Sequence, residues 1–138
     1  MSASHWSDQY IGIPYTPRGC ARDGTDCWGL VRLVYSEILK IDLPDFDISY
    51  VTEADNARIA DLVAEQKRVG EWVAINPDGV HEFDLLIIRW RALETHVAIV
   101  CGRSLMLHAM SGHDSHKARI GEWRGRVACA YRHWTRAS

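Results

Sequence analysis

One cysteine and two histidines have the residue types and the sequence setting for nucleophilic catalysis. Cys27 follows the turn-forming and helix-capping residues of DGTDCWGL and precedes an apolar stretch. A thiol in the first turn of a helix faces unpaired N–H groups and the positive end of the helix dipole, and both stabilise its thiolate. His96 in THVAIV could act as a base, and His108 in LMLHAM could orient it. The three residues therefore predict a site for thiol-dependent acyl transfer.

Each of these residues also has an ordinary structural interpretation. A free cysteine often packs as a small hydrophobic side chain. A histidine taken singly is more often a packed or exposed ring without a catalytic role. The catalytic hypothesis therefore depends on the fold bringing the three residues together.

Two helices are predicted in the first half of the chain. Apolar residues recur at helical spacing after Cys27, and Thr25 or Asp26 could cap the start of this helix. A second amphipathic pattern covers residues 54–69 and ends at Gly70. The first helix would hold Cys27 in its first turn.

The second half of the chain predicts an antiparallel sheet. Short runs with a period of two are rich in β-branched and aromatic residues: EWVAI, DLLIIRW, THVAIV, SLMLHAM and RVACAYRHW. Within THVAIV, alternation places His96 on one face with Ala98 and Val100, opposite Val97 and Ile99. Helices followed by such a sheet are typical of an α+β domain.

The register of one hairpin decides whether the two histidines share a face. A tight loop of Gly102 and Arg103 would pair Val97 with His108 and separate the histidines. A loop from Cys101 to Arg103, or a bulge, would instead pair His96 directly with His108. We predict the second register.

The composition excludes several classes of protein. With a length of 138 residues the chain is expected to form one domain, residues 1–138, and a formal charge of −2 gives no basic field for nucleic acid. The N-terminal MSASHWSDQY has no signal-peptide pattern, and no apolar stretch is long enough to span a bilayer. We therefore expect cytoplasmic synthesis without a signal peptide, and no membrane insertion.

The cysteines are expected to be free thiols. Their number is too small for a disulfide scaffold: Cys20, Cys27, Cys101 and Cys129. Cys129 is expected in the last strand, on one face with Val127 and Tyr131. Because a thiol at a helix start has a lowered pKa, Cys27 should react faster than the other three.

HDSH brings His113 and His116 close in sequence, with Cys20 and Cys27 upstream, and these are residue types that bind metal ions. The chain has no CxxC pair and no HExxH pattern, so we expect neither a metal nor a cofactor. Residues 111–118 are instead expected to form a polar loop beside the active site.

Two other classes of function remain open. Exposed tryptophans could stack sugars in a glycan-binding module, or the chain could be a structural component of a larger particle. A binding module has no need of the cysteine and histidine set, which favours an enzyme. The tryptophans are Trp6, Trp28, Trp72, Trp90, Trp123 and Trp134.

Three ordered motifs resemble the NlpC-type cell-wall cysteine peptidases, which are papain-like hydrolases of peptidoglycan stem peptides. DCWGLVRLVY resembles the nucleophile helix of that family, HVAIV its histidine strand, and LMLHA the strand with its third polar residue. IGIPY upstream and DLLII before the histidine strand extend the resemblance from about Tyr10 to His108. The resemblance implies a papain-like α+β domain whose nucleophile helix packs on an antiparallel sheet.

The resemblance also implies roles for individual residues. Cys27 would be the nucleophile, His96 the general base and His108 the group that orients it. The residues expected to line the substrate and oxyanion side are Tyr15, Asp26 and Trp28. The implied substrate is a stem peptide with a γ-D-glutamyl to diamino-acid bond. Amidase or acyl-transfer chemistry on another bond is the alternative.

The sequence departs from the family pattern at two positions. Trp28 stands where the family usually has a small residue, often Ser, and Phe83 stands before Asp84 where Gly is common. Trp28, the start YIGIPY and the end YRHW resemble a compact branch found in tailed phages and gene transfer agents. This branch implies tail-tip or baseplate hub proteins as partners, and action in the envelope of a target cell.

Overall fold

The structure is a computed structural model that describes residues 5–16, 19–43, 72–90, 93–110 and 112–136. The helix predicted over residues 54–69 lies outside the described residues. The described elements, in chain order, are η1 (Trp6–Tyr10), β1 (Cys20–Ala21), β2 (Gly24–Thr25), α1 (Cys27–Val34), η2 (Tyr35–Leu39), β3 (Trp72–Ile75), η4 (Pro77–Gly79), β4 (Leu85–Trp90), β5 (Leu93–Val100), β6 (Leu105–Met110), β7 (His113–Arg119), α3 (Ile120–Trp123), η5 (Arg124–Arg126), β8 (Val127–His133) and η6 (Trp134–Arg136).

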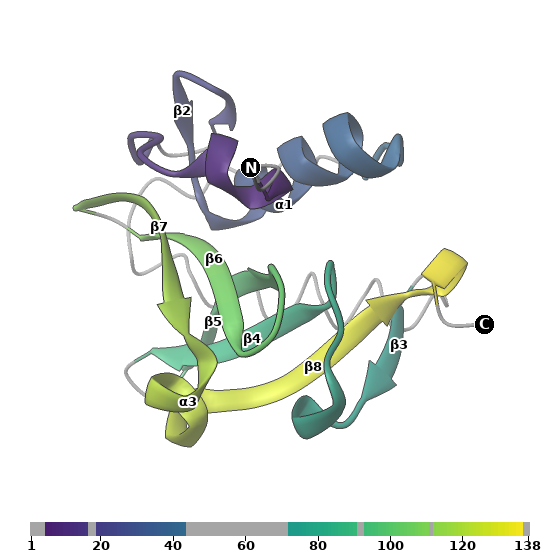
Figure 1. The fold of residues 1–138 in the computed structure, drawn as a ribbon. Coiled ribbons are helices and arrows are strands. Elements are labelled where there is room, and N and C mark those ends of the chain that lie inside the picture. The colour runs from purple at the N-terminus through teal and green to yellow at the C-terminus, as the bar shows by residue number, and fades with distance from the viewer. Residues whose placement is uncertain (1–4, 17–18, 44–71, 91–92, 111, 137–138) are drawn as a thin grey trace.

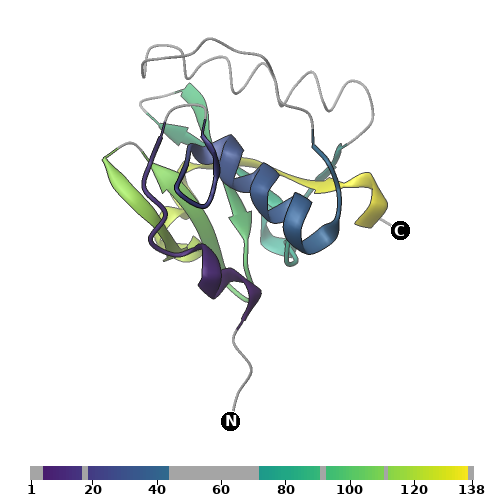
Figure 2. The same ribbon diagram turned by 90° about the horizontal axis from the view of Figure 1, so that it is seen from above.

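The strands β3 to β8 form one antiparallel sheet, in the order β3-β8-β4-β5-β6-β7. The β1–β2 hairpin, α1 and η1 lie on one side of this sheet, and α3 lies on the far side from α1 (Figure 1). Viewed from above, α1 crosses over the strands (Figure 2). The predicted α+β class, with the nucleophile helix on an antiparallel sheet, is therefore confirmed. No helix among the described residues is long and apolar enough to cross a membrane.

Helix α1 begins at Cys27 because the preceding residue caps it. The Asp26 carboxylate accepts the Gly29 N–H at 2.6 Å, which satisfies one of the unpaired N–H groups of the first turn. Gly29 is also required by packing, since a Cβ built there would lie 1.7 Å from the Gly19 carbonyl oxygen. The β1–β2 hairpin and the helix start are thus in direct backbone contact.

The sheet has an apolar cluster on each face. On the α1 side, Val97 and Ile99 of β5 pack with Leu30 and Val31 of the helix. On the other face, Ala98 and Val100 alternate into a second cluster that Trp123 of the α3 turn helps to cover. The alternation predicted for THVAIV is confirmed, because its odd-numbered and even-numbered residues enter different clusters.

The predicted strand runs correspond to β3, β4, β5, β6 and β8, but the prediction for residues 111–118 is wrong. His113–Arg119 form β7, which pairs with β6 at the edge of the sheet. Ser115 is the one residue of β7 that is fully buried, and its side chain accepts the Ile13 N–H at 2.8 Å. A strand with so few buried positions shows no apolar period.

The predicted direct pairing of His96 with His108 is also wrong. The observed pairs are Ile99 with Leu107 and Val100 with Met106, whereas the prediction would set Val100 opposite Ser104. The turn is therefore centred on Arg103 rather than on Gly102, and positive φ angles at Gly102 and Ser104 allow this position.

The corrected register nevertheless keeps the histidines on one face. A shift of two residues preserves the side-chain parity of a strand. Continued along the strands, the observed register sets His108 opposite Ala98, so His96 is its diagonal neighbour. His96 and His108 therefore share a face, as predicted, although they are not directly paired.

Strand β8 differs from its prediction in one detail. Ile87 pairs with Cys129 but Ile88 pairs with Val127, so the register shifts between these two positions. Cys129 and Tyr131 therefore pack toward α1, while Val127 packs against the opposite cluster. The prediction that all three share a face is wrong because the irregularity reverses the alternation.

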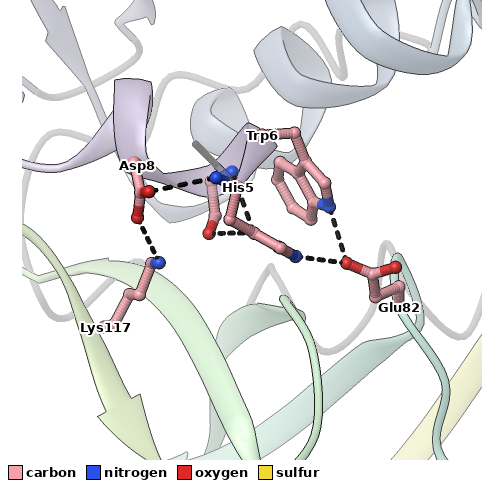
Figure 3. Close-up of polar contacts among 6 residues, drawn as sticks. His5, Trp6, Asp8, Glu82 and Lys117 are labelled. Atoms are coloured by element: carbon pink, nitrogen blue, oxygen red, sulfur yellow. Dashed lines mark hydrogen bonds and ion pairs between the residues drawn. The ribbon is translucent and has the colours of Figure 1, made fainter. Parts of the chain in front are cut away.

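The N-terminal segment is fastened to the sheet by polar contacts (Figure 3). One Glu82 carboxylate oxygen accepts the Trp6 indole N–H at 2.8 Å and lies 2.5 Å from His5 Nε2. Asp8 forms an ion pair with Lys117 of β7, at 2.6 Å. Together these contacts hold η1 against the start of β4 and the edge strand.

Phe83 has a left-handed backbone, with φ of 72°. This conformation favours glycine, which accounts for the glycine common in the family at this position. Here the aromatic ring offsets the strain, because it is buried and stacks on Trp6 with a centroid separation of 4.5 Å. The Phe83 carbonyl also accepts the Tyr35 hydroxyl at 2.5 Å.

Candidate active site

Cys27 lies at the start of α1, as the sequence predicts, and its side chain is 6% exposed. The backbone N–H groups of Val97, Trp28 and Cys27 itself are directed at the thiol and lower its pKa. Two of these groups are unpaired N–H groups of the first helical turn, and the third belongs to β5. The thiol therefore lies where the helix start meets the histidine strand.

The resting thiol does not have the lowered pKa expected from its helix position. Burial raises the pKa of Cys27 to about 12, and the nearby Asp26 carboxylate adds to the rise. The three N–H groups oppose this rise but do not overcome it. At rest the Cys27 thiol is therefore protonated.

The two predicted histidines are in direct contact. His96 Nε2 and His108 Nδ1 are 2.8 Å apart, which is hydrogen-bond distance. His108 is 1% exposed, and its ring forms a T-shaped pair with the Trp123 indole, with a centroid separation of 5.3 Å. The structure thus brings His96 and His108 together as the sequence predicts.

The thiol and the imidazoles approach from different faces of β5. Cys27 packs in the cluster on the α1 side, whereas alternation places His96 on the face of Ala98 and Val100. The peptide unit between His96 and Val97 links the two groups, because the Val97 N–H is directed at the Cys27 thiol.

Burial keeps both imidazoles neutral. It lowers the pKa of His96 to about 3 and that of His108 to about 4, and the His116 imidazole adds to both shifts. A neutral imidazole has one nitrogen with a lone pair, so it can accept a proton. The site therefore contains a neutral thiol and neutral imidazoles rather than a resting ion pair.

The three residues expected on the substrate and oxyanion side have different settings. Tyr15 is half-buried and forms an isolated bridge with Thr25, which places it beside the residues that precede Cys27. Asp26 is buried and caps the helix, so its carboxylate serves the backbone. Trp28 is 7% exposed and packs in the α1-side cluster. Their contact with substrate stays a prediction.

Sequence reasoning missed His116 as a member of this site. It pairs with His108 across the β6–β7 ladder, and the two Nε2 atoms are 3.1 Å apart. Its Nδ1 lies 2.9 Å from the Asp114 carbonyl oxygen. The signal was present in HDSH, but a loop assignment left no register to place it opposite His108.

The other cysteines are less suitably placed for a nucleophile, and the tryptophans for a sugar-binding surface. Cys20 and Cys129 are half-buried and not part of a disulfide, while burial raises the pKa of Cys101 to about 11. Among the described side chains, no three His, Cys, Asp or Glu residues are grouped as a metal site requires. Of the tryptophan side chains that the structure describes, only Trp134 is exposed, which offers little surface for stacking sugars.

Comparison with known proteins places this fold. One similar solved structure is the NlpC/p60 domain of the peptidoglycan hydrolase SagA, with 22% sequence identity and a TM-score of 0.63, over 91% of this chain and 92% of that one. Another is NlpC1 from Trichomonas vaginalis, with 20% identity and a TM-score of 0.68, over 94% of this chain and 42% of that one. An NlpC/P60 family protein from Bacillus cereus also matches, with 22% identity and a TM-score of 0.64, over 90% of this chain and 36% of that one. The chain spans nearly all of the SagA domain but about two fifths of the other two proteins.

The family assignment rests on the sequence match, because structural likeness at this identity shows the fold alone. No curated protein matches the sequence. The sequence model of the NlpC/P60 family matches residues 12–132, which include Cys27, His96 and His108. The chain therefore belongs to the NlpC/P60 family of cysteine peptidases and peptidoglycan hydrolases.

Proposed function

We propose that this protein hydrolyses the γ-D-glutamyl to diamino-acid amide bond of peptidoglycan stem peptides, with Cys27 as nucleophile and His96 as general base. The observation that carries the proposal is the His96–His108 hydrogen bond of 2.8 Å beside the peptide N–H that is directed at the Cys27 thiol. The likeness to the SagA domain, which comes from a peptidoglycan hydrolase, supports the substrate class.

The proposed reaction begins with transfer of the thiol proton to His96 as the sulfur attacks the amide carbonyl. The pKa values of the resting groups make a free thiolate rare, so deprotonation and attack are coupled. N–H groups at the helix start would donate to the developing oxyanion, where a fixed donor gains strength as charge develops.

The second half returns the site to its starting state. The His96 imidazolium gives its proton to the departing amine of the diamino acid, which leaves a thioester on Cys27. Water then attacks the thioester with His96 as base, and the γ-carboxyl of D-glutamate is released. The proposed chemistry uses only the thiol, the imidazoles and water.

Digestion of defined muropeptides tests the proposal. The protein, a Cys27→Ala variant and a Cys129→Ala control would be incubated with muropeptides containing the γ-D-glutamyl linkage, and the products identified by mass spectrometry. We expect cleavage at that bond by the unmodified protein and by the control, and none by Cys27→Ala. Cleavage at the sugar to peptide junction would indicate an amidase instead, and cleavage by Cys27→Ala would overturn the role of the thiol.

We also propose that the enzyme is carried by a phage-like particle, through tail-tip or baseplate hub proteins, and acts in the envelope of the target cell. The support is the sequence resemblance of Trp28, YIGIPY and YRHW to the compact phage-tail branch. Peptide mass spectrometry of purified particles tests this proposal. Detection of the chain in particles at a fixed ratio to tail proteins is expected, and its absence from them would contradict it.

A further inference from the structure

We propose that His116 is a positioning residue that fixes which nitrogen of His96 carries the lone pair. The observation is a continuous chain of three imidazoles that ends on a backbone carbonyl. His96 contacts His108 at 2.8 Å, His108 contacts His116 at 3.1 Å, and His116 contacts the Asp114 oxygen at 2.9 Å. The inference rests on the proposed role of His96 as the general base.

The direction of the chain follows from its outer end. A carbonyl oxygen can only accept a hydrogen bond, so His116 Nδ1 must carry the proton that it donates to Asp114. In a neutral ring the other nitrogen, Nε2, then has the lone pair. It accepts a proton from His108 Nε2.

The same reasoning passes through the next two rings. His108 donates from Nε2, so its Nδ1 has the lone pair and accepts from His96 Nε2. His96 therefore keeps its proton on Nε2, and its lone pair lies on Nδ1. The reverse direction would set the lone pair of His116 Nδ1 against that of the Asp114 oxygen at 2.9 Å, which is repulsive.

This arrangement leaves His96 with one basic atom, Nδ1, to take the Cys27 proton. When it does so, His96 becomes an imidazolium that still donates from Nε2 to His108. Each ring of the chain is then polarised in the same direction, which strengthens the hydrogen bonds and stabilises the new charge. Burial supports the assignment, because it keeps His96 and His108 neutral at rest.

Nuclear magnetic resonance of the imidazole nitrogens tests the inference without any measurement of activity. A protonated ring nitrogen and one with a lone pair have well-separated ¹⁵N chemical shifts. At pH 8, above the ordinary imidazole pKa of about 6.5, we expect His96 to be protonated on Nε2. A proton on Nδ1 of His96 in the unmodified protein would overturn the inference.

Three substitutions extend the test. In His116→Gln the amide oxygen can still accept from His108, so the His96 proton should stay on Nε2. In His116→Lys the ammonium can only donate, so the chain should reverse and the proton should move to Nδ1. His81→Lys makes the same change at an exposed histidine outside this chain of imidazoles and should leave His96 unchanged. A His116→Lys variant that folds and keeps its proton on Nε2 would contradict the inference.

Muropeptide cleavage gives the second readout. His116→Gln should retain most of the activity, whereas His116→Lys should lose about a hundredfold or more, because the base nitrogen is blocked. Equal losses in both variants would indicate a merely structural role and overturn the inference. Absence of cleavage by the unmodified protein would refute the proposed function and leave the nitrogen assignment to the resonance spectra.

Discussion

Replacing Asp26 by asparagine separates the two effects that this residue has on Cys27. The carboxylate caps α1 through the Gly29 N–H, and its charge raises the pKa of the thiol. Asparagine caps a helix about as well as aspartate, so Asp26→Asn keeps the cap and removes the charge. We therefore expect the variant to fold normally and its Cys27 to react faster.

The size of the effect can be worked out from the thiol pKa. With a pKa of about 12, about one Cys27 in ten thousand is a thiolate at pH 8. A neighbouring charge shifts a pKa by about 1–3 units. Each unit of lowering gives about ten times more thiolate, but the less basic thiolate loses about threefold in nucleophilicity. The net gain is about threefold in alkylation rate for each unit.

The assay is alkylation by iodoacetamide at pH 8, with the modification of each cysteine followed by peptide mass spectrometry. Asp23→Asn, which removes an exposed charge from the turn before β2, is the matched control and should leave the rate unchanged. An Asp26→Asn protein with normal thermal stability and an unchanged or slower Cys27 rate would refute this electrostatic reasoning.

Three further predictions concern stability. His96 and His108 have folded pKa values of about 3 and 4, so the unfolded chain, with imidazole pKa values of about 6.5, binds more protons between these values. Stability should thus be complete above about pH 6.5 and fall toward pH 4, by up to about 1.4 kcal/mol per pH unit for each ring. Thermal unfolding against pH checks this, and an equal slope in His108→Gln would contradict it. Phe83→Gly relieves about 1 kcal/mol of backbone strain but removes about 3–5 kcal/mol of aromatic packing. Urea unfolding should therefore show a lower free energy of unfolding, and a more stable variant would contradict this reasoning. The buried Asp84 accepts two hydrogen bonds from Arg132, at 2.8 and 2.9 Å. Asp84→Asn should therefore lower the free energy of unfolding by about 3 kcal/mol. If the losses of Asp84→Asn and Arg132→Met add fully in the double variant, the two residues are not coupled and the prediction is wrong.

The positions of the candidate catalytic residues were predictable because local patterns determine where they lie in their elements. Asp26 and the apolar period after Cys27 define the helix start, and alternation in THVAIV assigns His96 to its face. These features depend on neighbours in sequence, so one chain is enough to find them.

The errors arose where longer-range geometry decides the structure. The turn after Val100 is centred one residue later than predicted, where Gly102 and Ser104 take left-handed conformations that the residue types alone do not require. Strand β7 is polar because it lies at the sheet edge, so its period was invisible and His116 was missed. The resting pKa of Cys27 depends on burial, which a sequence motif does not report.

The most direct test of the account is to locate the nucleophile with a substrate-like electrophile. A stem-peptide analogue with a diazomethyl ketone in place of the scissile γ-D-glutamyl amide would be added to the protein and to a His96→Ala variant, and the modified residue identified by peptide mapping. The account predicts labelling of Cys27, and slow or absent labelling in His96→Ala. Preferential labelling of Cys20, Cys101 or Cys129, or labelling of Cys27 at the same rate in both proteins, would contradict it.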